Sequence, residues 1–235
     1  RWKIKLTSFS KKSFKEISEG KVSKYFVSSS KKFKSAKINK TNPININLPS
    51  IQRDKYYVVI DPGHGGPDSG AIGVNGLRET DVVLDISKIV SKLLKEKGIK
   101  VKMTRNNEID VDLFPRVALA NRTKADIFVS IHANASRGKK RNINGIETFY
   151  YSRKGRLLAE KIQKELLKVS PGSPDRGVRR GRYFVIKRTN MPAVLAEIGF
   201  VTGRLDARRL EKKIHRKRVA HAIAKGIIEY LKRVG

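Results

Sequence analysis

Four polar residues that can bind metal or move protons stand at the ends of apolar runs in the sequence. His64 follows the first run in Asp-Pro-Gly-His-Gly-Gly, and His132 follows a later one in Ser-Ile-His-Ala-Asn. Glu79 precedes a helical pattern, and Glu197 ends the last apolar run. Two imidazoles and one carboxylate can hold a catalytic zinc ion, with water in the fourth position. The metal lowers the pKa of that water, and Glu197 is the remaining carboxylate that can pass its proton to a leaving nitrogen.

Each of these residues also has an ordinary structural explanation. A histidine after a strand is often only a hydrogen-bonded structural residue, and a glutamate at a helix start is often a cap. The glycines from Gly63 to Gly66 could form a phosphate loop, but they lack the Gly-x-x-x-x-Gly-Lys spacing. Glu197 is harder to explain, because a carboxylate in an apolar strand is costly to bury without a partner. The four together favour a site, and the spacing alone leaves the zinc and structural interpretations open.

The elements that position these residues are predicted from apolar periodicity. Helical patterns lie between several short β-branched runs, which predicts a largely parallel sheet covered on both faces, with its site at the strand ends. We expect an α/β fold: a single-domain, twisted, mostly parallel mixed sheet of about six strands flanked by helices. The predicted strands are Lys55–Ile60, Ile99–Met103, Asp126–Ile131, Ile146–Tyr151, Tyr183–Ile186 and Ala193–Glu197. The predicted helices cover roughly residues 81–97, 115–124, 158–169 and 210–230.

Basic residues gather in two further places along this predicted fold. A loop with Arg176, Arg179, Arg180 and Arg182 precedes the predicted fifth strand, and it is either solvated or a clamp for peptide carboxylates. Arg179, Arg180 and Asn134 are our candidate substrate-binding residues. His215 and His221 stand among lysines and arginines of the final helix, where we expect a solvated basic face.

Composition restricts the remaining possibilities. The 235 residues include no cysteine, so disulfides and thiolate metal sites are excluded, and the formal net charge is +32. Such a charge fits nucleic acid, simple solubility or an anionic wall polymer. Residues 1–52 form a basic Lys/Ser-rich linker or extension, and residues 53–235 are the predicted catalytic domain. No apolar run approaches the roughly 20 residues of a membrane span, and we expect a processed or partial chain whose export signal is absent.

Several sequence motifs occur in a specific order along the chain. They are Val58–Gly66, Gly76–Glu79, Met103–Arg105, Arg116 through Ala120-Asn121, Phe128–Asn134 and Met191–Phe200. Together they resemble the zinc-dependent N-acetylmuramoyl-L-alanine amidases of the Amidase_3 type. The resemblance covers about Tyr57 to Leu231, and Asp110–Leu113 is similar to cyanobacterial members.

The resemblance implies that His64, Glu79 and His132 bind zinc and that Glu197 is the catalytic acid/base. It implies hydrolysis of the amide between N-acetylmuramic acid and L-alanine of peptidoglycan stem peptides, during wall remodelling or cell separation in the periplasm or wall. Some members carry a helical insert that covers the zinc, but here only Arg153-Lys154-Gly155 separates the strand near Ser152 from the next helix. We therefore expect an open site.

Two other functions compete with the amidase. The first is a binding module of the same fold that holds wall polymer or nucleic acid on its basic face. The retained Glu197 argues against it, since a binder has no use for a proton shuttle. The second is a zinc peptidase that cuts between stem amino acids by the same metal chemistry. We expect peptidoglycan as the partner, no nucleic acid, no membrane span and a monomer.

Overall fold

The computed structural model describes residues 47–136 and 142–235, which belong to one compact unit beginning at Ile46. Our predictions for residues 1–46 of the basic extension lie outside the described residues. Leu48 is buried and Ile51 packs against the core, so the packed part of the chain starts upstream of residue 53. Within the described ranges, no helix has both the length and the apolar character to cross a membrane.

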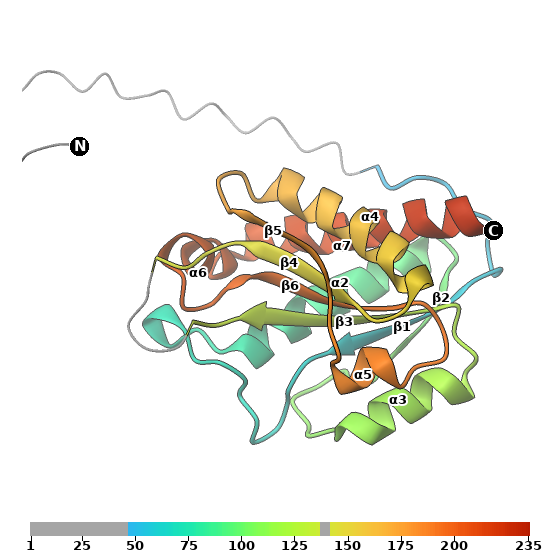
Figure 1. The fold of residues 1–235 in the computed structure, drawn as a ribbon, viewed down its shortest axis with the longest axis horizontal. Helices are drawn as coiled ribbons and strands as arrows, with labels where there is room; N and C mark the ends of the chain where they lie inside the picture. The colour runs from blue at the N-terminus through green and yellow to red at the C-terminus, as the bar shows by residue number, and fades with distance from the viewer. Residues whose placement is uncertain (1–46, 137–141) are drawn as a thin grey trace, which may run out of the picture. The chain divides into compact units, whose positions relative to one another are not determined.

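A six-stranded mixed sheet forms the centre of this unit, as the sequence predicts (Figure 1). The strand order is β2-β1-β3-β6-β4-β5, and neighbouring strands run parallel except for the antiparallel pair of β4 and β6. The carboxyl ends of β1, β3 and β6 therefore meet at one edge of the sheet. The strands are β1 (Tyr57–Pro62), β2 (Lys100–Met103), β3 (Ile127–Asn134), β4 (Ile146–Tyr150), β5 (Asp175–Arg180) and β6 (Ala193–Phe200).

Helices cover both faces of the sheet (Figure 1). Apolar side chains fill the space between the helices and the sheet. On one face, α7 packs against α2 and α4 over the larger core cluster, which includes Ile86, Leu158 and Ile223. On the other face, α3 and α5 enclose a smaller cluster around Phe128. The helices are α2 (Glu79–Glu96), α3 (Leu113–Arg122), α4 (Arg153–Val169), α5 (Phe184–Lys187), α6 (Arg204–Leu210), α7 (Lys213–Val234) and the 3-10 turn η2 (Val74–Gly76).

The position of the fifth strand was predicted wrongly. The run Tyr183–Ile186 forms the short helix α5, and the strand lies upstream in Asp175–Arg180, inside the segment expected to be a basic loop. Only Val178 is apolar in this strand, so no hydrophobic alternation marks it. Its backbone pairs with β4 at the edge of the sheet, where charged side chains are common because they discourage pairing with other chains. The predicted final helix corresponds to α7, which begins at Lys213, whereas Leu210, its expected first residue, ends the separate helix α6.

His215 does not lie on a solvated face, contrary to our expectation. Its side chain is 7% exposed near the start of α7. Burial, followed by the charges of Arg209 and Arg218, lowers the pKa of His215 to about 4. The imidazole of His215 is therefore neutral in the folded protein near neutral pH.

This burial predicts an acid-sensitive contribution to stability. The unfolded chain protonates His215 near its ordinary pKa of about 6.5, whereas the folded chain resists protonation down to about pH 4. The stabilisation is complete above pH 6.5 and is lost as the pH falls toward 4, by at most about 3 kcal/mol. Urea unfolding of wild type and His215→Gln between pH 4 and 7.5 measures this contribution of His215 to the free energy of unfolding. The free energy of unfolding should fall less steeply in the variant, and identical slopes would contradict the assignment.

Candidate metal centre

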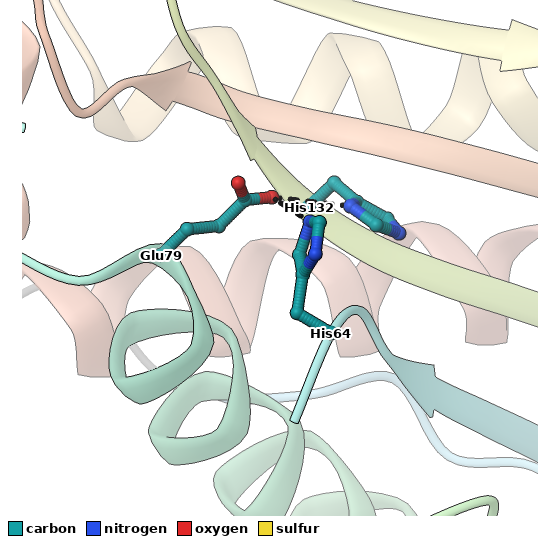
Figure 2. A group of neighbouring side chains, drawn as sticks. All are labelled: His64, Glu79 and His132. Carbon is teal, nitrogen blue, oxygen red and sulfur yellow. Dashed lines mark hydrogen bonds and ion pairs between the residues drawn. The ribbon is translucent and has the colours of Figure 1, made fainter. Parts of the chain in front are cut away.

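Three potential ligands from separate elements converge at the carboxyl edge of the parallel strands (Figure 2). His64 follows β1, Glu79 opens α2 and His132 lies in β3. Glu79 Oε1 is 3.1 Å from His64 Nε2 and 3.1 Å from His132 Nδ1. The ligand atoms all lie within 4.8 Å of one another, and no other such group of three occurs in residues 47–136 and 142–235.

Hydrogen bonds behind these side chains fix their orientation. His64 Nδ1 lies 2.7 Å from Asp68 Oδ2, so Nδ1 carries the proton and Nε2 is directed to Glu79. The backbone N–H groups of Ala133 and Ala71 donate to the two oxygens of Glu79, each at 3.0 Å. A carboxylate behind a ligating histidine is a frequent feature of metal sites, because it sets the tautomer and raises ligand basicity.

The charges of this cluster favour a cation at its centre. Burial alone raises the pKa of Glu79, but hydrogen bonds from His132 and His64 outweigh it and hold that pKa well below its usual range. Burial likewise lowers the pKa of His64, yet Glu79 and Asp68 outweigh it and raise the pKa to about 9. The carboxylates thus attract positive charge here, and a divalent cation can supply it in place of protons. Two imidazoles and one carboxylate also match the donor set of a catalytic zinc site.

Two buried arginines hold the loop that carries His64. Arg116 donates to the carbonyl oxygens of Pro62 at 2.6 Å and His64 at 2.8 Å, and Arg105 donates to Gly63 O at 2.6 Å. His64 has a φ of 59°, a conformation that costs a non-glycine residue energy unless its surroundings impose it. A Cβ at Gly63 would lie 2.2 Å from the His132 ring, so only glycine lets the loop approach this close.

Asp61 anchors the same arrangement beneath the loop. Its buried carboxylate accepts hydrogen bonds from Thr104 Oγ1 at 2.6 Å, Ser130 Oγ at 2.7 Å and Arg116 Nη1 at 3.0 Å. These donors follow β2, lie in β3 and lie in α3, so one carboxylate joins three elements to the end of β1. The sequence motifs contained Asp61, Arg105 and Arg116, but nothing in their spacing assigned them this role.

Glu197 lies beside the cluster, in register with His132 across β3 and β6. Its Oε2 is shielded from solvent and has no hydrogen-bond partner. Burial, together with the negative charges of Glu79 and Glu147, raises the pKa of Glu197 to about 7, although His132 opposes this. A carboxyl group with such a pKa can both accept and donate a proton near neutral pH.

Glu147 is a site residue that sequence reasoning missed. It faces Glu197 across the antiparallel pair of β4 and β6, and it is 4% exposed. Asn134 Nδ2 donates to Glu147 Oε1 at 2.7 Å, and Arg179 Nη1 lies 3.4 Å from Oε2. The available signal was a glutamate within an otherwise apolar run, the same one that marked Glu197. Asp68 was also missed, although it follows His64 by four residues in the glycine-rich loop.

The three candidate substrate residues do not converge on the His/Glu cluster itself. Asn134 and Arg179 meet at Glu147, whereas the Arg180 guanidinium lies over the Tyr151 ring, 5.4 Å from its centroid. A pocket of about 270 Å³ lies beside the histidines and is lined in part by residues of α3 and α5. Its lining includes His64, His132, Asp68, Leu113, Tyr183 and Phe184.

The chain belongs to the Amidase_3 family of N-acetylmuramoyl-L-alanine amidases, whose profile matches residues 58–229. It is 41% identical over 177 residues to the N-acetylmuramoyl-L-alanine amidase LytC of Bacillus subtilis, covering 74% of this chain but only 35% of LytC. The chain therefore spans about a third of that relative's length.

Solved structures show the same fold. The amidase AmiC2 of Nostoc punctiforme superimposes with a TM-score of 0.74 at 42% identity, covering 77% of this chain and all of that one. The catalytic domain of the amidase CwlV from Bacillus (Paenibacillus) polymyxa has a TM-score of 0.71 at 38% identity, covering 75% and 98%. The predicted family and fold are thus confirmed.

The contacts of Arg116 predict a large loss of stability on its removal. Arg116→Gln takes away the charge that faces buried Asp61 and frees two loop carbonyls, so the free energy of unfolding should fall by about 3–5 kcal/mol. Arg122→Gln is the matched control, since it removes the same charge from an exposed position on the same helix. Urea unfolding of both variants measures the difference. Equal stability of the two variants would show that Arg116 does not hold the loop.

Proposed function

We propose that the chain hydrolyses the amide bond between the lactyl group of N-acetylmuramic acid and L-alanine of peptidoglycan, in the cell wall or periplasm. We further propose that it does so with zinc held by His64, Glu79 and His132. The observation that carries the proposal is the convergence of these three ligands beside Glu197, whose Oε2 is buried without a partner. Family membership supports the choice of substrate.

The residues of the site divide the work of such a hydrolysis. A bound zinc ion would act as a Lewis acid and lower the pKa of a coordinated water. Asp68 orients the His64 ring, and the N–H groups of Ala71 and Ala133 keep Glu79 in place. Glu197 takes a proton from the attacking water and delivers it to the nitrogen of the departing L-alanine. A pKa of about 7 suits both transfers.

The two competing functions remain distinguishable by experiment. A pure binding module gains nothing from a Glu197 carboxylate whose Oε2 is shielded from solvent without a hydrogen-bond partner, since this costs stability. A zinc peptidase would use the same residues and differ only in its products. Mass spectrometry of purified peptidoglycan after digestion separates them. Free stem peptides that begin with L-alanine support the amidase, and peptides cut between stem residues would contradict it.

The site should work without an activator. The structure starts α4 at Arg153, three residues after β4 ends at Tyr150, which leaves no room there for a covering insert. The segment Pro171–Arg182 contains β5, whose backbone pairs with β4 and fixes the segment to the sheet. The digestion is therefore performed with the purified chain alone.

Loss of one ligand should remove the metal. We expect about one zinc per wild-type chain, and His132→Ala should lose both zinc and activity because only two ligands remain. His221→Ala is the control, since His221 lies on α7 and bonds to the Lys217 carbonyl. Elemental analysis of dialysed protein gives the zinc content. Full occupancy in His132→Ala would remove His132 from the ligand set.

Loss of the acid/base should leave the metal in place. Glu197→Gln keeps the shape of the side chain but cannot accept a proton, so turnover should fall by about 10²–10⁴-fold at unchanged zinc content. Glu160→Gln, at an exposed position on α4, is the matched control. The turnover rates of wild type and both variants are measured on a soluble muropeptide. Turnover of Glu197→Gln near that of the control would exclude Glu197 from the chemistry.

A further inference from the structure

A row of polar residues crosses the sheet away from the His/Glu cluster. His132 on β3 pairs with Glu197 on β6, Glu197 pairs with Glu147 on β4, and Glu147 pairs with Gly177 on β5. Residues paired in this way stand on the same face of a sheet. The row therefore leads from the proposed metal ligands, through the proposed acid/base, to the edge strand β5.

Glu147 and its partners form the outer end of this row. The carboxylate is 4% exposed and faces Arg179 Nη1 at 3.4 Å and Arg176 Nε at 3.6 Å. Gly177 offers no side chain, and a Cβ placed there would meet nothing within 4 Å. Glu147 contacts one Nη atom of the Arg179 guanidinium. Because the Arg179 side chain is 58% exposed, the remaining N–H donors of this guanidinium can bind a ligand.

The distance from the ligands to this guanidinium suits a specific part of the substrate. Neighbouring strands are about 4.8 Å apart, so Glu147, two strands from His132, is roughly 10 Å away, with Arg179 at or beyond it. A peptide that leaves the scissile bond along this row advances about 3.5 Å per residue. The residue after L-alanine is then about 7 Å out, and a carboxylate on it comes within hydrogen-bond reach of Arg179.

We propose that Arg179, held in place by Glu147, binds a free carboxylate on the stem residue that follows L-alanine and so selects substrates that carry it. A planar guanidinium fork matches a carboxylate in shape and charge. Arg180 has another role, since its guanidinium lies over the Tyr151 ring. The inference rests on the proposed function for the direction of the peptide, but it concerns binding and can be measured without cleavage.

The test uses the peptide product as a probe. Calorimetry compares the binding of the tripeptide L-alanyl-γ-D-glutamyl-L-lysine, whose glutamyl α-carboxylate is free, with that of the same tripeptide carrying an amide in place of that α-carboxylate. Wild type should bind the free acid about 10- to 100-fold more tightly, as expected for a charge-assisted hydrogen bond. Arg179→Gln should bind both peptides equally, with affinity for the amide unchanged. Arg179→Lys, which keeps the charge and loses the fork, should retain part of the preference.

Arg180→Gln is the matched control for the general electrostatic attraction of anionic peptides, because it removes the same charge from the next residue of β5. It should keep the preference for the free acid. The proposal would be overturned if wild type bound both peptides equally. It would also be overturned if Arg179→Gln and Arg180→Gln lost the preference for the free acid to the same extent. Preference for the acid without any cleavage of muropeptide would instead refute the amidase proposal and leave the Arg179 assignment standing.

Discussion

The site depends on hydrogen bonds from two buried guanidinium groups to the backbone that follows β1. Arg105 and Arg116 bind the carbonyl oxygens of Pro62, Gly63 and His64, which would otherwise be poorly satisfied in a tight turn. Asp61 neutralises one of these charges and joins the turn to its neighbouring elements. Because these hydrogen bonds hold the turn, His64 can keep a φ of 59° and direct Nε2 toward Glu79. The cluster of proposed ligands is thus preorganised by residues that do not belong to it.

Concentrated negative charge is the second feature of the site, in a chain whose formal net charge is +32. Glu79, Glu147 and Glu197 occupy neighbouring positions, and each is stabilised in a different way. Glu79 has two imidazoles and two backbone N–H groups, and Glu147 has an amide and two arginines. Glu197 has an oxygen with no donor, and burial raises the pKa of this carboxyl group to about 7. One cluster therefore contains both a carboxylate suited to bind a cation and a carboxyl group whose pKa suits proton transfer near neutral pH.

The sequence predicted the parts of the fold and site that depend on residue type and local pattern. His64, His132 and Glu197 stand out because polar residues at the ends of apolar strands are unusual, and the sheet brings them together as expected. β5 escaped prediction because pairing with β4, rather than hydrophobic alternation, makes Asp175–Arg180 a strand. Glu147 was missed because its importance comes from partners on β3 and β5. His215 was misjudged because its burial arises from tertiary packing, which its basic neighbours in sequence do not reveal.

We propose that this chain folds into a preformed three-ligand zinc site with one position left for water. The most direct measurement is X-ray diffraction from crystals of the zinc-loaded protein, with anomalous data collected on both sides of the zinc absorption edge. One strong zinc peak should lie between His64 Nε2, Glu79 and His132 Nδ1, with a water in the fourth position and Glu197 close to that water. Zinc bound elsewhere, a fourth protein ligand that closes the site, or a 62–64 turn that has left Arg105 and Arg116 would contradict the proposal.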